Sequence, residues 1–285
     1  MGHSVVEAAE QLLDKEIPVL DKGFVRLVDY MGSDDRIVQS ARVSYGAGTK
    51  SFREDKGLID YLMRNRHTSP FEQVILTFHT KMPIFVARQW VRHRTARLNE
   101  ISGRYSIMED EFYVPDPEHI AVQSEDNKQG RSSEPVESDV AEAFQTALRA
   151  EQDQAYKAYL ERVDAGVARE LARVNLPISL YTQWYWQIDL HNLFHFLSLR
   201  IDPHAQYEIR AYAEVMLDCA RAVAPIATAA FEQHMVGSVS FSRKEYEALQ
   251  AVLAGQAVEE VSSGLGIKGR ALDRLKAKLS GTPSH

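Results

Sequence analysis

The chain has 285 residues, with 33 Lys and Arg against 40 Asp and Glu, a net charge of -7, and 45% hydrophobic residues. This composition is typical of a globular protein, and a chain of this length can bury a core without a metal or disulfide. The single cysteine, Cys219, excludes an internal disulfide and cysteine-rich zinc sites, and favours a reducing compartment such as the cytoplasm. The acidic balance argues against a general nucleic-acid binder but leaves a local basic site open.

In the first part of the chain, neither a signal peptide nor a membrane-spanning segment is predicted, because no long apolar run occurs. Alternating apolar residues at Val74, Leu76 and Phe78 predict a strand after Pro70, and Pro83 suits the first turn of the next helix. The elements expected here are strands over 24–31 and 71–82 and helices over 35–41, 55–64 and 84–94.

In the second part, residues 115–138 are polar and acidic, which predicts a surface loop. An apolar stripe then predicts a long helix, with Gly166 as the residue that ends it. The other elements expected are an extended segment over 103–107, helices over 140–165, 167–174, 190–199 and 203–231 (broken at Pro225), and a strand over 179–188.

These patterns predict one α+β domain over 1–241, followed by a charged helical extension over 242–285. The extension has an apolar rhythm around Gly255 and Gly264 that loosely resembles a helix-turn-helix. A solvated helical extension or a subunit contact explains this rhythm more simply.

The densest cluster of chemistry lies at 89–105, QWVRHRTARLNEISGRY. Arginine holds phosphates and carboxylates bidentately and stays charged at any working pH. This cluster therefore favours an anionic ligand, although surface ion pairs are the alternative. Its charged members are Arg92, His93, Arg94, Arg97, Glu100 and Arg104.

A second cluster contains His191 and His195, which are four residues apart and share one helix face. Two such histidines can bind a metal, with Asp189, Asp202 and His204 as further candidates, but a satisfied pair of helix histidines is favoured over a metal. A third cluster, HTSPFE at 67–72, is by itself a capped turn. Cys219 lies in a helical pattern and is expected to pack in the core, and no GxSxG, P-loop or GxGxxG motif is present.

Together these clusters resemble the flavin-dependent thymidylate synthase family. Its mark is RHR, seven residues and Ser, which here is Arg92-His93-Arg94 followed by Ser102. The strings HTSPFE, LARVNLPISLYTQWYW and LSLRIDPHAQYEIR accompany it in the right order, and the resemblance covers about 24–235. It implies a mixed α/β fold that is not Rossmann-like, with an antiparallel-rich sheet and long helices.

The resemblance also implies an activity. Such enzymes methylate dUMP to dTMP, with 5,10-methylenetetrahydrofolate as the carbon donor, FAD as cofactor and NADPH as reductant. They need no cysteine nucleophile, and they are homotetramers with active sites shared between subunits. Neither a metal, a nucleic-acid partner nor a membrane is expected.

The resemblance also implies roles for the residues at matching positions of this sequence. Arg200 is implied as the catalytic arginine, which polarises the uracil. The positions implied for dUMP are Gln89, Trp90, Val91, Arg92, Glu100, Ile101, Ser102, Gly103, Arg104, Arg173 and Arg200. Those implied for FAD are Ser69, Arg92, His93, Arg94, Glu100, Asp189, Leu190, His191 and His195, with Ser44, His67 and Glu72 as further candidates. Some family members have Asn or Arg at 189, 191 and 195, which leaves the kind of FAD contact open.

Three alternatives remain. The arginine cluster and the C-terminal extension would suit a phosphate-binding or nucleic-acid module. Asp189, His191 and His195 would suit a metalloenzyme. An inactive relative would still bind nucleotide.

Overall fold

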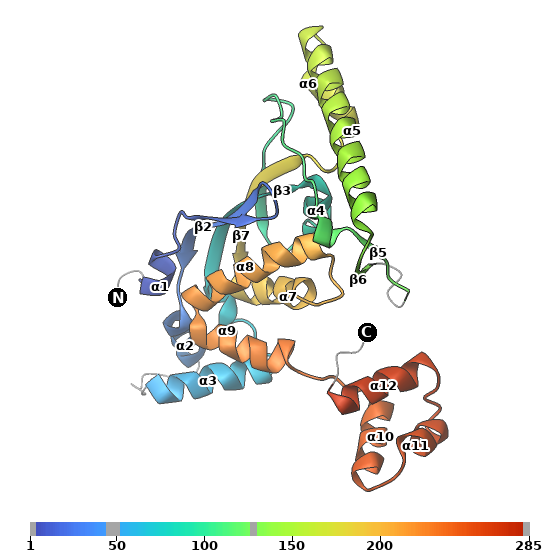
Figure 1. Ribbon diagram of the computed structural model, residues 1–285. Coiled ribbons are helices and arrows are strands. Elements are labelled where there is room, and N and C mark those ends of the chain that lie inside the picture. Colours follow the sequence, from blue (N-terminus) through green and yellow to red (C-terminus); the bar gives the residue numbers. More distant parts are fainter. Residues whose placement is uncertain (1–3, 44–51, 126–129, 282–285) are drawn as a thin grey trace.

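A five-stranded antiparallel sheet lies at the centre of the molecule in the computed structural model, which describes residues 4–43, 52–125 and 130–281 (Figure 1). Its strand order is β1 (Glu16–Val19), β2 (Gly23–Met31), β3 (Ile75–Pro83), β7 (Tyr181–Asp189) and β4 (Arg97–Glu100). The two central strands, β3 and β7, pair over their whole length, from Ile75 opposite Asp189 to Pro83 opposite Tyr181. The expected strands at 24–31 and 179–188 are confirmed, and the α+β class with them.

The sheet has one apolar and one polar face, because successive side chains in a strand point to opposite sides. Leu76 and Phe78 of β3 lie opposite Ile188 and Trp186 of β7, and all four are buried. Helices α4 (Ile84–Trp90), α7 (Leu190–Arg200) and α8 (Tyr207–Val223) cover this face, and α9 (Pro225–Phe231) packs against α8 (Figure 1). Helices α2 (Asp34–Arg42) and α3 (Phe52–Arg64) pack beside α9, and the short α1 (Glu7–Glu10) packs against α8.

The other face carries polar and aromatic side chains. His79 stacks on Tyr185 with ring centroids 4.7 Å apart, and its Nε2 lies 2.9 Å from the Oε1 of Gln183. Arg26 lies 2.8 Å from the Nδ1 of the same histidine. Tyr185 is 45% exposed, so this face is not covered by the chain itself.

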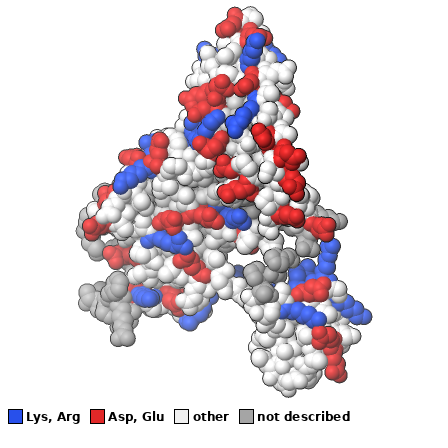
Figure 2. Space-filling view, viewed as in Figure 1, with Lys and Arg blue, Asp and Glu red and all other residues white. Residues whose placement is uncertain are grey.

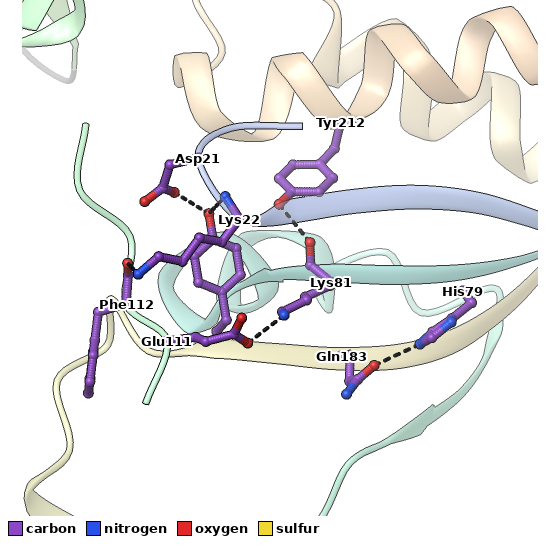
Figure 3. A network of polar contacts seen from close by, with 9 residues as sticks. Asp21, Lys22, His79, Lys81, Glu111, Phe112, Gln183 and Tyr212 are labelled. Carbon is purple, nitrogen blue, oxygen red and sulfur yellow. Dashed lines mark hydrogen bonds and ion pairs between the residues drawn. The ribbon is translucent and has the colours of Figure 1, made fainter. Parts of the chain in front are cut away.

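A polar network fixes the end of the sheet where β2, β3 and β7 meet the segment before residue 115 (Figure 3). Lys81 forms an ion pair with Glu111, and the Lys22 Nζ donates to the carbonyl of Phe112 at 3.2 Å. The hydroxyl of Tyr212 donates to the carbonyl of Lys81 at 2.7 Å. These contacts hold residues 108–114 against the sheet, which matters because the predicted phosphate loop precedes them.

A long helix, α5 (Ser138–Asp164), projects beyond the sheet, and Gly166 follows its C-cap with a φ of +82°, which suits glycine at this position (Figure 1). Tyr159 of this helix is buried in a second apolar cluster, together with Met108, Phe112, Ala172 and Leu180. The short α6 (Arg169–Ala172) and a 3₁₀ turn (Arg173–Asn175) follow. This cluster brings Arg173 back to residue 103.

Several sequence expectations need correction. Helix α4 ends at Trp90 rather than near 94, because residues 97–100 form the unpredicted edge strand β4. Residues 103–107 form a turn rather than an extended segment, with the amides of Tyr105 and Ser106 donating to the Ser102 carbonyl. The expected loop at 115–138 contains a 3₁₀ turn (Pro117–His119) and a hairpin of β5 (Ala121–Gln123) and β6 (Arg131–Pro135).

Helix 203–231 also differs from expectation, because α8 begins only at Tyr207, while the break falls at Ala224 as Pro225 indicated. The remaining expected helices agree within a few residues, and strand β3 begins at 75 after a 3₁₀ turn (Phe71–Gln73). None of the helices in the described part of the chain combines the length and apolarity needed to cross a membrane.

The C-terminal module (residues 241–280) is set apart from the rest of the molecule (Figure 1). It consists of α10 (Arg243–Leu253), α11 (Val258–Gly264) and α12 (Arg270–Ser280). Its three buried residues, Ala248, Ile267 and Leu275, form a cluster separate from the main core. The extension is therefore a small packed unit of helices with a core of its own.

Candidate active site

Arg200 at the end of α7 lies beside the end of α4. Its Nε donates to the Nε2 of His93 at 3.1 Å, and its Nη2 donates to the carbonyl of Gln89 at 3.3 Å. The side chain of Gln89 hydrogen-bonds in turn to Gln206, just before α8. The guanidinium of Arg200 is thus held beside His93 of the RHR motif by groups that follow or belong to the end of α4.

His93 is neutral at physiological pH. Burial, the charge of Arg200 and then His195 lower its pKa from 6.5 to about 4. A neutral imidazole can accept the hydrogen bond from Arg200 through Nε2, which the protonated ring could not do. The ring also packs edge-on against Phe196 at 4.9 Å and against His195 at 5.9 Å. His93 therefore sets the direction of Arg200.

A second group forms around Gly103. The residue is buried, and a Cβ built there would lie 2.8 Å from the Sδ of Met108 and 3.1 Å from the Cδ of Arg173. The amide of Arg104 donates to the Ser102 hydroxyl at 3.3 Å, and the Arg104 Nε donates to Glu170 at 3.0 Å. The structure thus brings Ser102, Gly103, Arg104 and Arg173 together, although Arg173 comes from a distant segment.

Glu100 sits on the edge strand, where its carboxylate accepts a hydrogen bond from Thr182 at 2.6 Å. Four arginines from the segments of the candidate site have neither a side-chain hydrogen bond nor an ion pair within the described residues: Arg92, Arg94, Arg97 and Arg173. Unpaired, exposed guanidinium groups in an acidic protein favour an external anion over internal ion pairs.

The HTSPFE segment packs against the start of α7. Phe71 contacts Phe194 with centroids 6.5 Å apart, and the Leu190 amide donates to the Val74 carbonyl at 2.8 Å. His67, Ser69 and Glu72 are exposed on this segment. Asp189 caps α7 by accepting from the Asn192 amide at 2.9 Å, a structural role in addition to the predicted FAD contact. Ser44 lies outside the described residues.

The side chain of Trp90 is not accessible for the predicted contact with dUMP. Its side chain has 0% exposure and packs against Trp184, Trp186 and Phe196 in the core. Only its backbone is left for a ligand. Val91 and Ile101, by contrast, are 39% and 36% exposed.

Sequence reasoning did not select Gln206, Thr182 or Glu170, which fix Gln89, Glu100 and Arg104. Gln206 and Thr182 stand in the strings LSLRIDPHAQYEIR and LARVNLPISLYTQWYW, which were the available signal, whereas Glu170 lies outside the quoted strings. A cavity of about 690 Å³ between the β5–β6 hairpin and the start of α8 touches this region only through Gln206. The site is instead an open surface, with Arg92, Arg94, Glu100 and Arg104 exposed.

The residues fit a flavin dinucleotide and a nucleotide monophosphate. Both ligands are anionic, and Arg92, Arg94 and Arg173 are exposed guanidinium groups without a side-chain partner among the described residues. Among the described residues, no group of three His, Cys, Asp or Glu comes together to hold a metal ion. Cys219 is buried and its pKa is raised to about 12 by burial and by Asp218, which makes it a poor nucleophile.

Comparisons with known proteins agree with this geometry. Residues 26–226 match the family model described as thymidylate synthase complementing protein, and residues 239–282 match that of the thymidylate synthase ThyX C-terminal domain. Proteins named flavin-dependent thymidylate synthase are similar throughout. That of Treponema denticola is 61% identical over 94% of this chain and 98% of its own, and that of Thermus thermophilus is 53% identical over 93% and 96%.

A solved structure, a UMP/dUMP methylase from Streptomyces cacaoi bound with 5-Br dUMP, superposes with a TM-score of 0.70 at 36% identity. It covers 77% of this chain and 98% of its own. Fold, site and sequence thus define a methyltransferase of the flavin-dependent class. The chain belongs to the thymidylate synthase complementing protein family, the flavin-dependent thymidylate synthases.

Proposed function

We propose that this chain converts dUMP to dTMP as a flavin-dependent thymidylate synthase, with 5,10-methylenetetrahydrofolate as carbon donor and NADPH as reductant. The observation that carries the proposal is the pairing of Arg200 with His93 of the RHR motif, beside a set of unpaired arginines. An enzyme that uses these metabolites is expected in the cytoplasm.

The phosphate of dUMP would be held by Arg104 and Arg173, with Ser102 and the backbone of Gly103 as neutral donors. The close packing of Arg173 on Gly103 supports this, because any side chain at 103 would displace the arginine. Gln89, Arg92, Glu100 and Ile101 would complete the nucleotide pocket, together with the backbone of Trp90 and Val91.

Arg200 would contact the uracil ring. A fixed positive charge there favours the anion at N3 and makes C5 more electron-rich, which is electrostatic stabilisation of charge that develops during the reaction. His93 holds the guanidinium in place, and it stays neutral so that no competing charge reaches the ring.

FAD, when bound, supplies the reducing electrons, so the protein needs no cysteine nucleophile. Ser69, His67 and Glu72 on one segment, and Asp189, Leu190, His191 and His195 on α7, would hold it with Arg92, His93, Arg94 and Glu100. The packing of the HTSPFE segment on α7 supports a common surface for these residues.

A homotetramer with shared sites is part of the proposal. Two observations support it: the site residues are exposed rather than enclosed, and the polar face of the sheet is left uncovered with Tyr185 45% exposed. A second subunit on such a surface would enclose the ligands and exclude water.

The direct test is a visible absorption spectrum of the purified protein, followed by titration with dUMP. The proposal predicts a flavin spectrum, spectral change on dUMP addition and NADPH oxidation that dUMP stimulates. A well-folded protein that cannot be loaded with FAD would rule it out.

A further inference from the structure

The C-terminal module (residues 241–280) differs in charge from the rest of the chain. It has seven Lys and Arg against five Asp and Glu, a net charge of +2, whereas the remaining residues have 26 against 35, a net charge of -9. The absence of a nucleic-acid partner was expected from the charge of the whole chain. That reasoning does not apply to the C-terminal module, because the module has its own core and its net charge is positive.

Its three helices follow one another as in helix-turn-helix proteins, where the last helix enters the major groove. Helix α11 ends at Gly264, and α12 begins at Arg270 after a turn in which Gly266 and Gly269 have φ of +73° and +53°. Leu275 is buried between these helices and α10. The opposite side of α12 is exposed.

Most cations of the module are already paired. Lys278 pairs with Glu245 and Lys276 with Glu259, both at 2.7 Å, and Arg243 pairs with Glu247 at 3.1 Å. The Lys244 Nζ donates to the carbonyl of Leu265 at 3.1 Å, which holds the start of α10 beside the turn. These pairs support the fold of the module and leave little charge for a partner.

Three cations are left, and all lie on the turn and the first two turns of α12. Lys268, Arg270 and Arg274 are exposed and have neither a hydrogen bond nor an ion pair from their side chains within the described residues. Arg270 and Arg274 are four residues apart and share one face, together with Asp273. Figure 2 shows Lys and Arg side chains together with Asp and Glu side chains on the visible side of the module.

The module has a core of its own, because Ala248, Ile267 and Leu275 form a cluster separate from the main core. We propose that the module binds double-stranded nucleic acid through Lys268, Arg270 and Arg274, with α12 against a groove and the three cations on backbone phosphates. The charge complementarity and the helix-turn-helix order favour a duplex over other anionic partners. The binding is weak and not sequence-selective, because three phosphate contacts carry no base information.

The test is fluorescence anisotropy of a labelled DNA duplex of about two helical turns, with the full-length, FAD-loaded enzyme at about 50 mM salt. Lys268→Ala, Arg270→Ala and Arg274→Ala are combined in one variant. A matched control combines Lys15→Ala, Arg149→Ala and Lys157→Ala, which remove the same charge from exposed positions elsewhere. Both variants should keep wild-type dTMP formation.

The proposal predicts that the wild-type enzyme binds the duplex. The logarithm of the association constant should fall linearly with the logarithm of the salt concentration, with a slope of about -2 to -3. The module variant should lose at least about tenfold in affinity, and the control should not. Three results would overturn it: no binding by the folded wild-type enzyme, equal binding by the module variant, or tighter binding to phosphatidylserine vesicles than to DNA. A change in the sedimentation of the module variant would equally overturn it, because it would make these cations a subunit contact.

Discussion

Arg200 is held by two acceptors, the His93 ring and the Gln89 carbonyl, so its position is set before any ligand arrives. Burial and the charge of Arg92 lower its pKa, yet it remains protonated at working pH. For Arg200→Ala we expect intact folding and FAD binding, with dTMP formation reduced by about 10²-fold or more, the range found when a donor to a developing anion is removed. Steady-state dTMP assays with Arg149→Ala as a surface control check this; near-normal turnover would refute the role.

His93 gives a pH-dependent prediction at the same scale. Its pKa in the folded state is about 4, below the ordinary 6.5, so the unfolded chain binds a proton there more readily. The free energy of unfolding therefore decreases as pH falls from about 6.5 towards 4. Above this range His93 is neutral in both states, and this loss of stability is absent. His93→Gln keeps an acceptor for Arg200 and removes this titration. Urea denaturation at pH 7 and at pH 5 should show a smaller loss for the variant, and an identical loss in both proteins would contradict the assignment.

The roles of Arg92, His93, Arg94 and Ser102 were implied by the resemblance to the flavin-dependent thymidylate synthases, whose motif lies within one short stretch. The contacts that orient them were not predictable in that way. Gln206, Thr182 and Glu170 come from other elements, and nothing in their local sequence marks them as partners of Gln89, Glu100 and Arg104.

At the scale of elements, the turn at Gly103 joins two distant segments. Gly103→Ala places a Cβ 2.8 Å from the Met108 Sδ and near the Arg173 side chain, so the arginine must shift. The expected result is a rise of about tenfold in KM for dUMP, the equivalent of one charged hydrogen bond, with FAD binding kept.

Gly57→Ala is the matched control for this substitution. Gly57 lies inside α3, and a Cβ there meets nothing within 4 Å. It should leave KM unchanged and raise the free energy of unfolding by about 0.5–1 kcal/mol, because alanine is the better helix former. If both variants changed KM alike, Gly103 would have no special role.

Element prediction succeeded where apolar residues recur with the period of a strand or of a helix, as for β3 and α5. It failed for α4 and β4, because the charged residues 92–97 fit a helix end equally well and the edge strand is fixed only by pairing with β7. The β5–β6 hairpin was missed for a similar reason. Its residues are mostly polar, and the Arg131–Glu208 ion pair at 2.7 Å that anchors it to α8 spans distant positions.

At the scale of the whole molecule, two packed units share one chain. The expected division into 1–241 and 242–285 remains a prediction, supported by the separate cluster around Leu275. Leu275→Ala should cost about 2–5 kcal/mol of stability within the module. Hydrogen exchange should then show loss of protection in α10 and α12 with the sheet unaffected. Loss of protection throughout would mean that the two units fold as one.

The measurement that tests the central claim most directly is dTMP formation by the FAD-loaded protein, given dUMP, 5,10-methylenetetrahydrofolate and NADPH and followed by chromatography. We expect dTMP in amounts that match the NADPH oxidised. Its formation should be lost when any one of the three substrates is omitted and strongly reduced in Arg200→Ala. Absence of dTMP from a folded protein that holds FAD and binds dUMP would contradict it.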